Sequence, residues 1–179
     1  PLREAVAGKD VEVQWMPFEL RPSPAPRLRP EDDYLQNAWT GSVYPMAKQM
    51  GVAMILPRIS PQPYSHLAFE GYQHAREHGK ANQYNLRIFE AFFQEEKDIG
   101  KVEVLSELAA EVGLDLDSFE QDLEARKYQE AHQQALHHAY HEARISAVPT
   151  FHIGELVLQG LQSRENLEQA IKLQITPSE

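Results

Sequence analysis

The sequence predicts an α/β protein in which β-strands near the two ends of the chain enclose a long helical block. Apolar residues alternate at Val11, Val13 and Trp15, and they alternate again between residues 150 and 158, which is the period of a β-strand. Between residues 31 and 143 the apolar residues recur at helical spacing instead. The predicted order is therefore strand, helical block, hairpin and closing helix.

Composition excludes several classes of function. The 179 residues carry a formal net charge of -10, and Lys and Arg do not form the clusters that bind nucleic acids and anionic membranes. The longest strongly apolar stretch, residues 52–56, is too short to span a bilayer, and no secretory signal is present. We therefore expect a cytoplasmic protein that binds neither nucleic acid nor membrane.

The N-terminal region combines a helix end, a strand and a linker. Residues 2–7 are typical of the last turns of a helix that Gly8 ends, so we expect that the sequence starts inside a helix. Residues 11–20 predict a strand that bends near Pro17, where the alternation changes phase. Prolines at positions 22, 24, 26 and 30 then favour a stiff linker over a ligand for an SH3-type domain.

Apolar stripes with start and stop signals predict the helices of the central block. Ser42 is expected to cap a helix that Gly51 ends, and Asp117 or Ser118 is expected to cap a later one. The expected helical segments include residues 34–39, 43–50, 66–78, 86–97, 104–112 and 127–144. Aromatic residues at this spacing belong more often to a core than to a substrate groove: Trp39, Tyr44, Phe89, Phe92 and Phe93.

The C-terminal tail predicts a hairpin followed by a helix. Residues 150–153 and 156–158 are two short strands, and Gly154-Glu155 between them suits a type II′ turn. Ser163 is expected to cap the closing helix, which presents Leu167, Ala170 and Ile171 to the sheet.

Four sequence segments resemble the DsbA-like thioredoxin family, in its FrnE and 2-hydroxychromene-2-carboxylate isomerase branch. The resemblance covers essentially the whole chain and implies a thioredoxin-like fold with a large all-helical insertion. It assigns residues 1–21 and 145–179 to the thioredoxin-fold portion and residues 22–144 to the insertion, including the connecting helix. The matching segments are Trp15 to Pro22, Ser60 to Tyr64, Ala91 to Phe93 with Asp98 to Gly100, and Ala147 to Phe151.

The resemblance also implies a reactive segment that this sequence does not contain. Similar proteins begin with a strand that ends in Cys-Pro-x-Cys at the start of the first helix, whereas these 179 residues contain no cysteine. We therefore expect the Cys-Pro-x-Cys motif before Pro1. In the family's sheet that strand lies between residues 11–15 and residues 150–153, so its absence would leave two strand edges without backbone partners.

Val148, Pro149 and Thr150 are the substrate-binding residues that the resemblance implies. A trans Val148-Pro149 bond is the expectation from sequence alone, because only about 5% of X-Pro bonds are cis in folded proteins. In similar proteins the proline is cis and faces the catalytic cysteines. The backbone of the preceding residue, here Val148, is then free to pair with a substrate strand by β-augmentation.

Three functions agree with these features. The favoured function is a thiol-disulfide oxidoreductase or isomerase, which needs no cofactor and acts on a protein or small-molecule disulfide. With serine in place of the first cysteine, similar proteins are glutathione-dependent isomerases of the 2-hydroxychromene-2-carboxylate type. A thiol-less thioredoxin-fold module that binds peptides or a partner through the Val148-Pro149 corner is the third reading. A homodimer is compatible with all three.

The histidines offer a rival site of another class. His74 with His78, and His137 with His141, are i,i+4 pairs that can each place two imidazoles on one helical face, and His132 and His138 lie near the second pair. The zinc-protease pattern H-E-x-x-H is absent, so we expect solvated polar faces rather than a metal site. The carboxylates at residues 95, 96, 115 and 117 are expected to be solvated or to cap helices, not to act as acid-base pairs.

Overall fold

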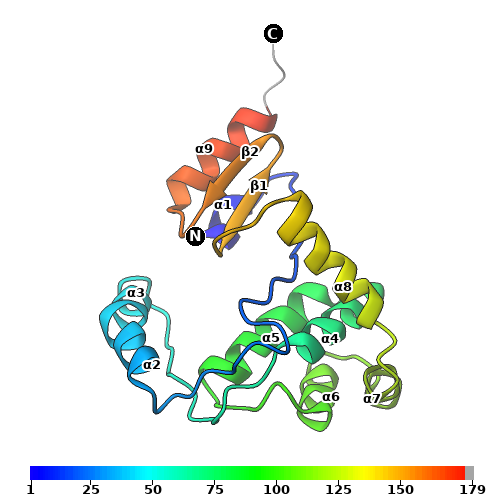
Figure 1. Cartoon of the computed structure of the whole chain (residues 1–179). Coiled ribbons are helices and arrows are strands. Elements are labelled where there is room, and N and C mark those ends of the chain that lie inside the picture. The colour runs from blue at the N-terminus through cyan, green and yellow to red at the C-terminus, as the bar shows by residue number, and fades with distance from the viewer. Residues whose placement is uncertain (176–179) are drawn as a thin grey trace. The chain divides into compact units, whose positions relative to one another are not determined.

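The computed structural model describes residues 1–175, which divide into two compact units (Figure 1). Unit 1 comprises Pro1–Gln14 and the residues from His137 onward, and unit 2 comprises Trp15–Leu136. The sequence placed the two boundaries after residues 21 and 144, whereas the structure divides the chain after residues 14 and 136. The segment from Trp15 to Arg21 therefore packs with the helices of unit 2 and not with the hairpin.

Unit 1 is a β-hairpin with two helices on one face. Strand β1 (Thr150–Ile153) pairs antiparallel with β2 (Leu156–Gln159), and Ile153 faces Leu156 across the turn. Gly154 has a φ of 56° while Glu155 has no positive φ, which is the pattern of the predicted type II′ turn. Helix α9 (Arg164–Ile175) begins where Ser163 Oγ accepts a hydrogen bond from the Asn166 amide, so this predicted cap is confirmed.

The apolar core of unit 1 lies between the hairpin and the two helices. Helix α1 (Leu2–Val6) packs against α9, and Figure 1 shows α9 beside the hairpin. Alternation decides which strand residues take part, because successive side chains point to opposite faces. Phe151, Ile153 and Leu158 face the helices, whereas His152 and Val157 are exposed. The buried centre consists of Ala5, Leu167 and Ile171.

The strand predicted over residues 11–20 is wrong for the part of the chain that the structure describes. The hairpin is the one sheet among residues 1–175, and residues 11–19 have no regular secondary structure. Their side chains still alternate, since Val11, Val13 and Trp15 are more buried than Glu12, Gln14 and Met16. The alternation was read correctly, but a strand also needs a hydrogen-bonded neighbour, and none of the described residues supplies one.

Unit 2 is a helical bundle joined by proline-rich loops. At its centre α4 (His66–Glu77) packs against α5 (Ala81–Phe93), α6 (Val102–Glu111) and α7 (Leu116–Glu124). The chain leaves the bundle through α8 (Gln129–His137) and a π-helical turn at His138–Glu142. The final helical run is thus shorter than the predicted residues 127–144, because Arg126 and Arg144 adopt positive φ values at its two ends.

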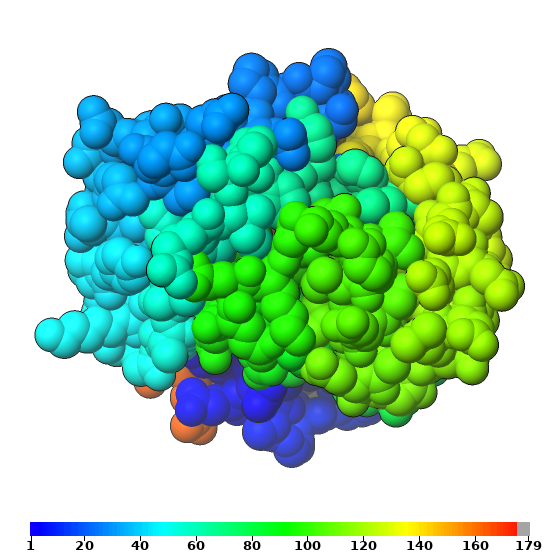
Figure 2. All heavy atoms as spheres, turned by 90° about the horizontal axis from the view of Figure 1, so that it is seen from below, coloured from blue at the N-terminus to red at the C-terminus, as the bar shows by residue number. Residues whose placement is uncertain are grey.

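A second helical layer forms an unbroken run in place of two separate helices. Helix α2 (Asp33–Ala38), the π-helical turn Trp39–Val43 and helix α3 (Tyr44–Gln49) follow one another directly. Ser42 lies inside this run and does not cap a helix, so that prediction is wrong. Figure 2 shows the light-blue and cyan residues of this run against the green surface of the bundle. The backbone bond from the Ile55 amide to the Phe93 carbonyl, 2.8 Å long, joins the two layers.

Asp115 caps helix α7, as part of the sequence analysis anticipated. Its Oδ1 accepts a hydrogen bond from the Ser118 amide at 2.9 Å, so Ser118 is the donor and neither it nor Asp117 is the cap. The hydrogen bond to the Ser118 amide is the largest cause that lowers the pKa of Asp115. No helix among residues 1–175 is long and apolar enough to cross a bilayer.

Gly71 allows the closest approach in the core of unit 2. A Cβ at this position would lie 2.7 Å from Phe119 Cζ and would also clash with the Tyr84 hydroxyl. Both rings are fully buried in the same apolar cluster as Leu105 and Leu123. Since close-packed cores do not yield easily, any side chain at position 71 must displace this cluster.

Replacing Gly71 by alanine is expected to lower the free energy of unfolding by about 1–3 kcal/mol through overpacking. Urea unfolding followed by circular dichroism measures this change. Gly41→Ala is the matched control, because Gly41 is helical and a Cβ there would meet nothing within 4 Å. Equal stability of the two variants would contradict this description of the core.

Candidate functional site

The loop before β1 forms a corner that is held from both sides. The Val148-Pro149 peptide is cis, as the resemblance implied. The Pro149 carbonyl accepts a hydrogen bond from the Gly160 amide at 2.8 Å, which attaches the corner to the end of β2. Thr150 Oγ1 donates to the Ala147 carbonyl at 2.6 Å and closes the turn on its other side. The three predicted binding residues, Val148, Pro149 and Thr150, therefore occupy one ordered corner.

The outer edge of this corner presents free backbone groups. Because Pro149 bonds toward β2, alternation turns the backbone groups of Phe151 and Ile153 toward β2 and those of Thr150 and His152 away from it. Among residues 1–175, no hydrogen bond uses the N–H or C=O of Val148. The Val148 side chain is 43% exposed. An extended chain can therefore add to this edge without displacing any described residue.

The corner can bind a peptide but carries no nucleophile of its own. The chain has no cysteine, and the corner residues are a valine, a proline and a threonine whose hydroxyl is already bonded to the backbone. Its only ionisable neighbour within β1 is His152, which points outward. Covalent chemistry at this corner thus requires a reactive group beyond these residues.

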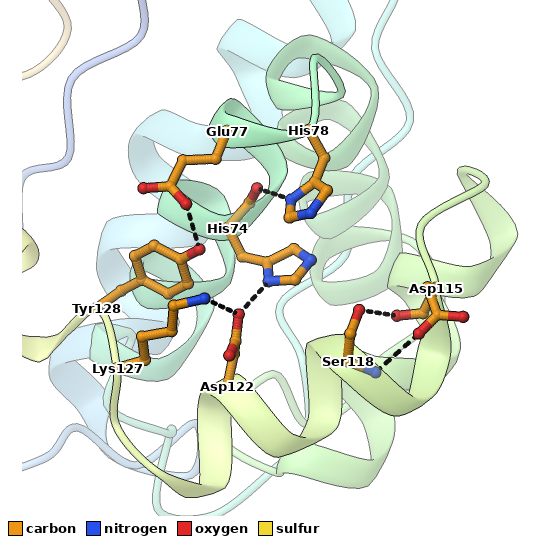
Figure 3. Close-up of polar contacts among 8 residues, drawn as sticks. All are labelled: His74, Glu77, His78, Asp115, Ser118, Asp122, Lys127 and Tyr128. Atoms are coloured by element: carbon orange, nitrogen blue, oxygen red, sulfur yellow. Dashed lines mark hydrogen bonds and ion pairs between the residues drawn. The ribbon is translucent and has the colours of Figure 1, made fainter.

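Most ionisable groups that are buried lie in unit 2, around α4 (Figure 3). His74 Nδ1 and Lys127 Nζ both contact Asp122 Oδ2, at 2.9 and 2.8 Å. Burial lowers the pKa of His74, and the hydrogen bond to Asp122 only partly opposes this effect. Burial alone would raise the pKa of Asp122, but hydrogen bonds from Lys127 and His74 leave it below the ordinary value. His74 is therefore a neutral imidazole at pH 7.

Tyr128 extends the same network on the other side of His74. Its hydroxyl donates to Glu77 Oε2 at 2.6 Å (Figure 3). Burial, followed by this hydrogen bond, raises the pKa of Tyr128 to about 12. The phenol consequently stays protonated at physiological pH and acts as a fixed donor, which is a structural use rather than a catalytic one.

Sequence reasoning missed two further buried pairs in unit 2. His132 Nε2 lies 2.7 Å from Glu19 Oε1, and both side chains are 3% exposed. Arg126 makes a two-pronged contact with Glu70, whose side chain is 1% exposed. A glutamate inside the otherwise apolar segment Trp15 to Leu20 was the one available signal for the first pair. Its partner, 113 residues away, follows no local pattern.

The two predicted histidine pairs form as ring contacts. The rings of His74 and His78 stack with centroids 4.2 Å apart, and those of His137 and His141 lie 4.7 Å apart. His74 Nδ1 is already bonded to Asp122, and His78 Nδ1 to the His74 carbonyl. Within residues 1–175 no group of three or more His, Cys, Asp or Glu residues is arranged to hold a metal ion.

The aromatic residues of the insertion divide between core and surface. Trp39 is buried and contacts Phe93, as expected for a core pair. Phe89 and Tyr44 are 50% and 39% exposed, so the expectation of core positions is wrong for these two. Helical spacing could not separate them, because Phe89 lies over the side of α5 that no described helix covers. The predicted solvated carboxylates Glu95 and Glu96 form ion pairs with Arg87 and Arg58.

Comparison with known proteins agrees with the sequence resemblance. The family model described as a DSBA-like thioredoxin domain matches residues 1–172. A protein of Bacillus subtilis (strain 168), named uncharacterized protein YwbO, is 53% identical over 169 residues. The alignment covers 94% of this chain and 84% of that relative.

The free energy of unfolding is expected to fall as the pH drops below about 6.5. Burial lowers the pKa of His74 and His66, so the unfolded chain binds protons before the folded one does. The loss begins near the unfolded-state pKa of about 6.5 and ends below the folded-state pKa, with at most about 1.4 kcal/mol per pH unit for each histidine.

Urea titrations between pH 7 and pH 5 measure this dependence. His74→Gln should flatten the curve, whereas His141→Gln, at an exposed position, should leave it unchanged. A free energy of unfolding that rises as the pH falls through this range would show that the folded state prefers the protonated imidazole.

Proposed function

This chain belongs to the DSBA-like thioredoxin domain family, and we propose that the protein acts as a thiol-disulfide oxidoreductase of the DsbA and FrnE type. The observation that carries the proposal is the open backbone edge at Val148 and Thr150. Such an edge recognises main chain in an extended conformation and is indifferent to most side chains. This recognition suits an enzyme whose substrates share a disulfide and little else.

Substrate docking uses backbone groups at the corner. An extended segment next to the substrate disulfide pairs with the N–H and C=O of Val148. Pro149 has no N–H, so the ladder is interrupted there and the docked segment is not drawn into a longer sheet. The bonds from the Gly160 amide and from Thr150 Oγ1 hold the corner in shape before the substrate arrives. Preformed geometry lowers the entropy lost on docking.

The exchange step needs a thiolate that these 179 residues do not supply. A cysteine thiolate attacks one sulfur of the substrate disulfide and forms a mixed disulfide, while the other sulfur leaves as a thiolate. A second thiolate then attacks the mixed disulfide, so the enzyme's dithiol is oxidised and the substrate disulfide is reduced. The reverse sequence oxidises a substrate dithiol. We place the pair of cysteines in a Cys-Pro-x-Cys segment that faces the corner.

A second candidate is a module that binds peptides through the same corner without any redox chemistry. The absence of cysteine from the sequence favours it. Both candidates use the edge at Val148, and they differ in whether bond exchange follows docking. A glutathione-dependent isomerase of the same family branch is the third reading, and it differs in needing glutathione as a cofactor for turnover.

Replacing Val148 by proline is expected to slow disulfide exchange several-fold to about tenfold, because it removes one docking hydrogen bond of about 0.5–1.5 kcal/mol. The assay is reduction of a peptide disulfide by the protein at its natural length. Val148→Thr is the matched control, since it keeps the backbone N–H and nearly the same side-chain shape.

Exchange by the Val148→Pro variant at the rate of Val148→Thr would contradict docking at this edge. No exchange by the unaltered protein, combined with retained peptide binding that Val148→Pro weakens, would favour the binding module. Turnover of an aromatic substrate only when glutathione is present would favour the isomerase.

A further inference from the structure

A small cavity in unit 2 joins three parts of the chain that the proposed exchange reaction does not use. Its volume is about 150 Å³. Two of its walls come from segments that the sequence analysis selected as distinctive, residues 60–64 and 98–100. The third wall is the proline-rich linker, which contributes Arg27. The lining residues are Arg27, Pro61, Pro63, Tyr64, His66, Asp98 and Gly100.

Specific contacts hold these walls in place. The Tyr64 hydroxyl donates to the Ala25 carbonyl at 2.8 Å, and the Gln62 amide donates to the Leu28 carbonyl at 2.8 Å. On the opposite wall the Gly100 amide donates to Asp98 Oδ1 at 3.0 Å. A Cβ on Gly100 would lie 2.7 Å from Pro63 Cβ, so only glycine permits this close approach. The cavity is therefore a built feature and not a gap between loose loops.

The cavity contains one positive and one negative side chain that do not neutralise each other. Within the described residues, Arg27 forms no ion pair, and its guanidinium carbon lies 5.4 Å from the centre of the Tyr64 ring. Asp98 likewise forms no ion pair, and its one described hydrogen bond uses Oδ1. Arg27 is exposed while Asp98 is half-buried, so a solute can reach both groups from solvent.

His66 adds a neutral polar group to the same cavity. Burial is the main cause that lowers its pKa, and the nearby positive charge of Arg126 acts in the same direction. The imidazole is therefore uncharged at pH 7 and serves as a hydrogen-bonding group. The fixed charges of the cavity remain those of Arg27 and Asp98.

We propose that this cavity binds the head group of an α-amino acid, with Arg27 at the carboxylate and Asp98 at the ammonium group. A simple anion would be repelled by Asp98, and a simple cation by Arg27, whereas a zwitterion satisfies both. The volume is below the roughly 300–1,000 Å³ that drug-sized ligands occupy, so nucleotides do not fit. This proposal does not depend on the proposed disulfide exchange, because it involves no thiol.

The same head group occurs in two kinds of ligand. A free amino acid carries it, and so does the γ-glutamyl end of glutathione. Titration calorimetry of the 179-residue chain with L-glutamate and with glutathione separates these sources. Glutarate, which lacks the ammonium group, is the control ligand. We expect saturable binding of glutamate or glutathione with a Kd below about 10 mM, and no binding of glutarate in that range.

Two variants test the assignment of the charges. Arg27→Gln and Asp98→Asn should each weaken binding at least about tenfold, the equivalent of one lost charged contact. Asparagine can still accept the Gly100 hydrogen bond, and Arg27 is exposed, so neither change should unfold the protein. Arg29→Gln is the matched control, because Arg29 lies in the same linker but pairs with Glu31 outside the cavity.

Binding that requires Arg27 and Asp98 but not Arg29 would establish the site, and the preferred ligand would identify its source. Absence of binding by both glutamate and glutathione would overturn the proposal. Binding that Arg27→Gln and Asp98→Asn leave unchanged, or equal binding of glutarate, would overturn it as well.

Discussion

The backbone edge of β1 is the constraint on which the account of function depends. A two-stranded hairpin is marginally stable in water and needs a covered face. In unit 1 helices α1 and α9 provide that cover through Leu167 and Ile171. Their packing fixes one face of the hairpin and the bonds to β2 fix one edge, which leaves the edge at Val148, Thr150 and His152 for another chain. The fold thus stabilises a surface whose hydrogen-bonding groups are still to be used.

Local signals in the sequence predicted the parts of the fold that depend on neighbouring residues. The hairpin at Gly154, the cap at Ser163 and the helix ends at Gly79 and Gly113 each follow from one residue type in one conformation. The strand over residues 11–20 failed for the opposite reason. Its alternation is real, but strand formation is decided by a partner that a local pattern does not contain.

The candidate site divides in the same way. Val148, Pro149 and Thr150 were identified by resemblance, and the structure brings them together in a corner with a free edge. The pairs Glu19 with His132 and Glu70 with Arg126 could not be predicted, because they join residues 113 and 56 positions apart. Burying a charge is costly unless it is paired, so these contacts lock the chain after Trp15 onto α4 and α8. The same packing positions the linker that carries Arg27.

The open edge serves disulfide exchange only if a thiolate stands beside it, so the number of thiols is the most direct test. We would measure the intact mass of the reduced protein, isolated at its natural length, before and after alkylation. The account predicts a mass increase that corresponds to two alkylated cysteines. A mass that alkylation leaves unchanged would contradict the oxidoreductase and leave a module that binds peptides through Val148.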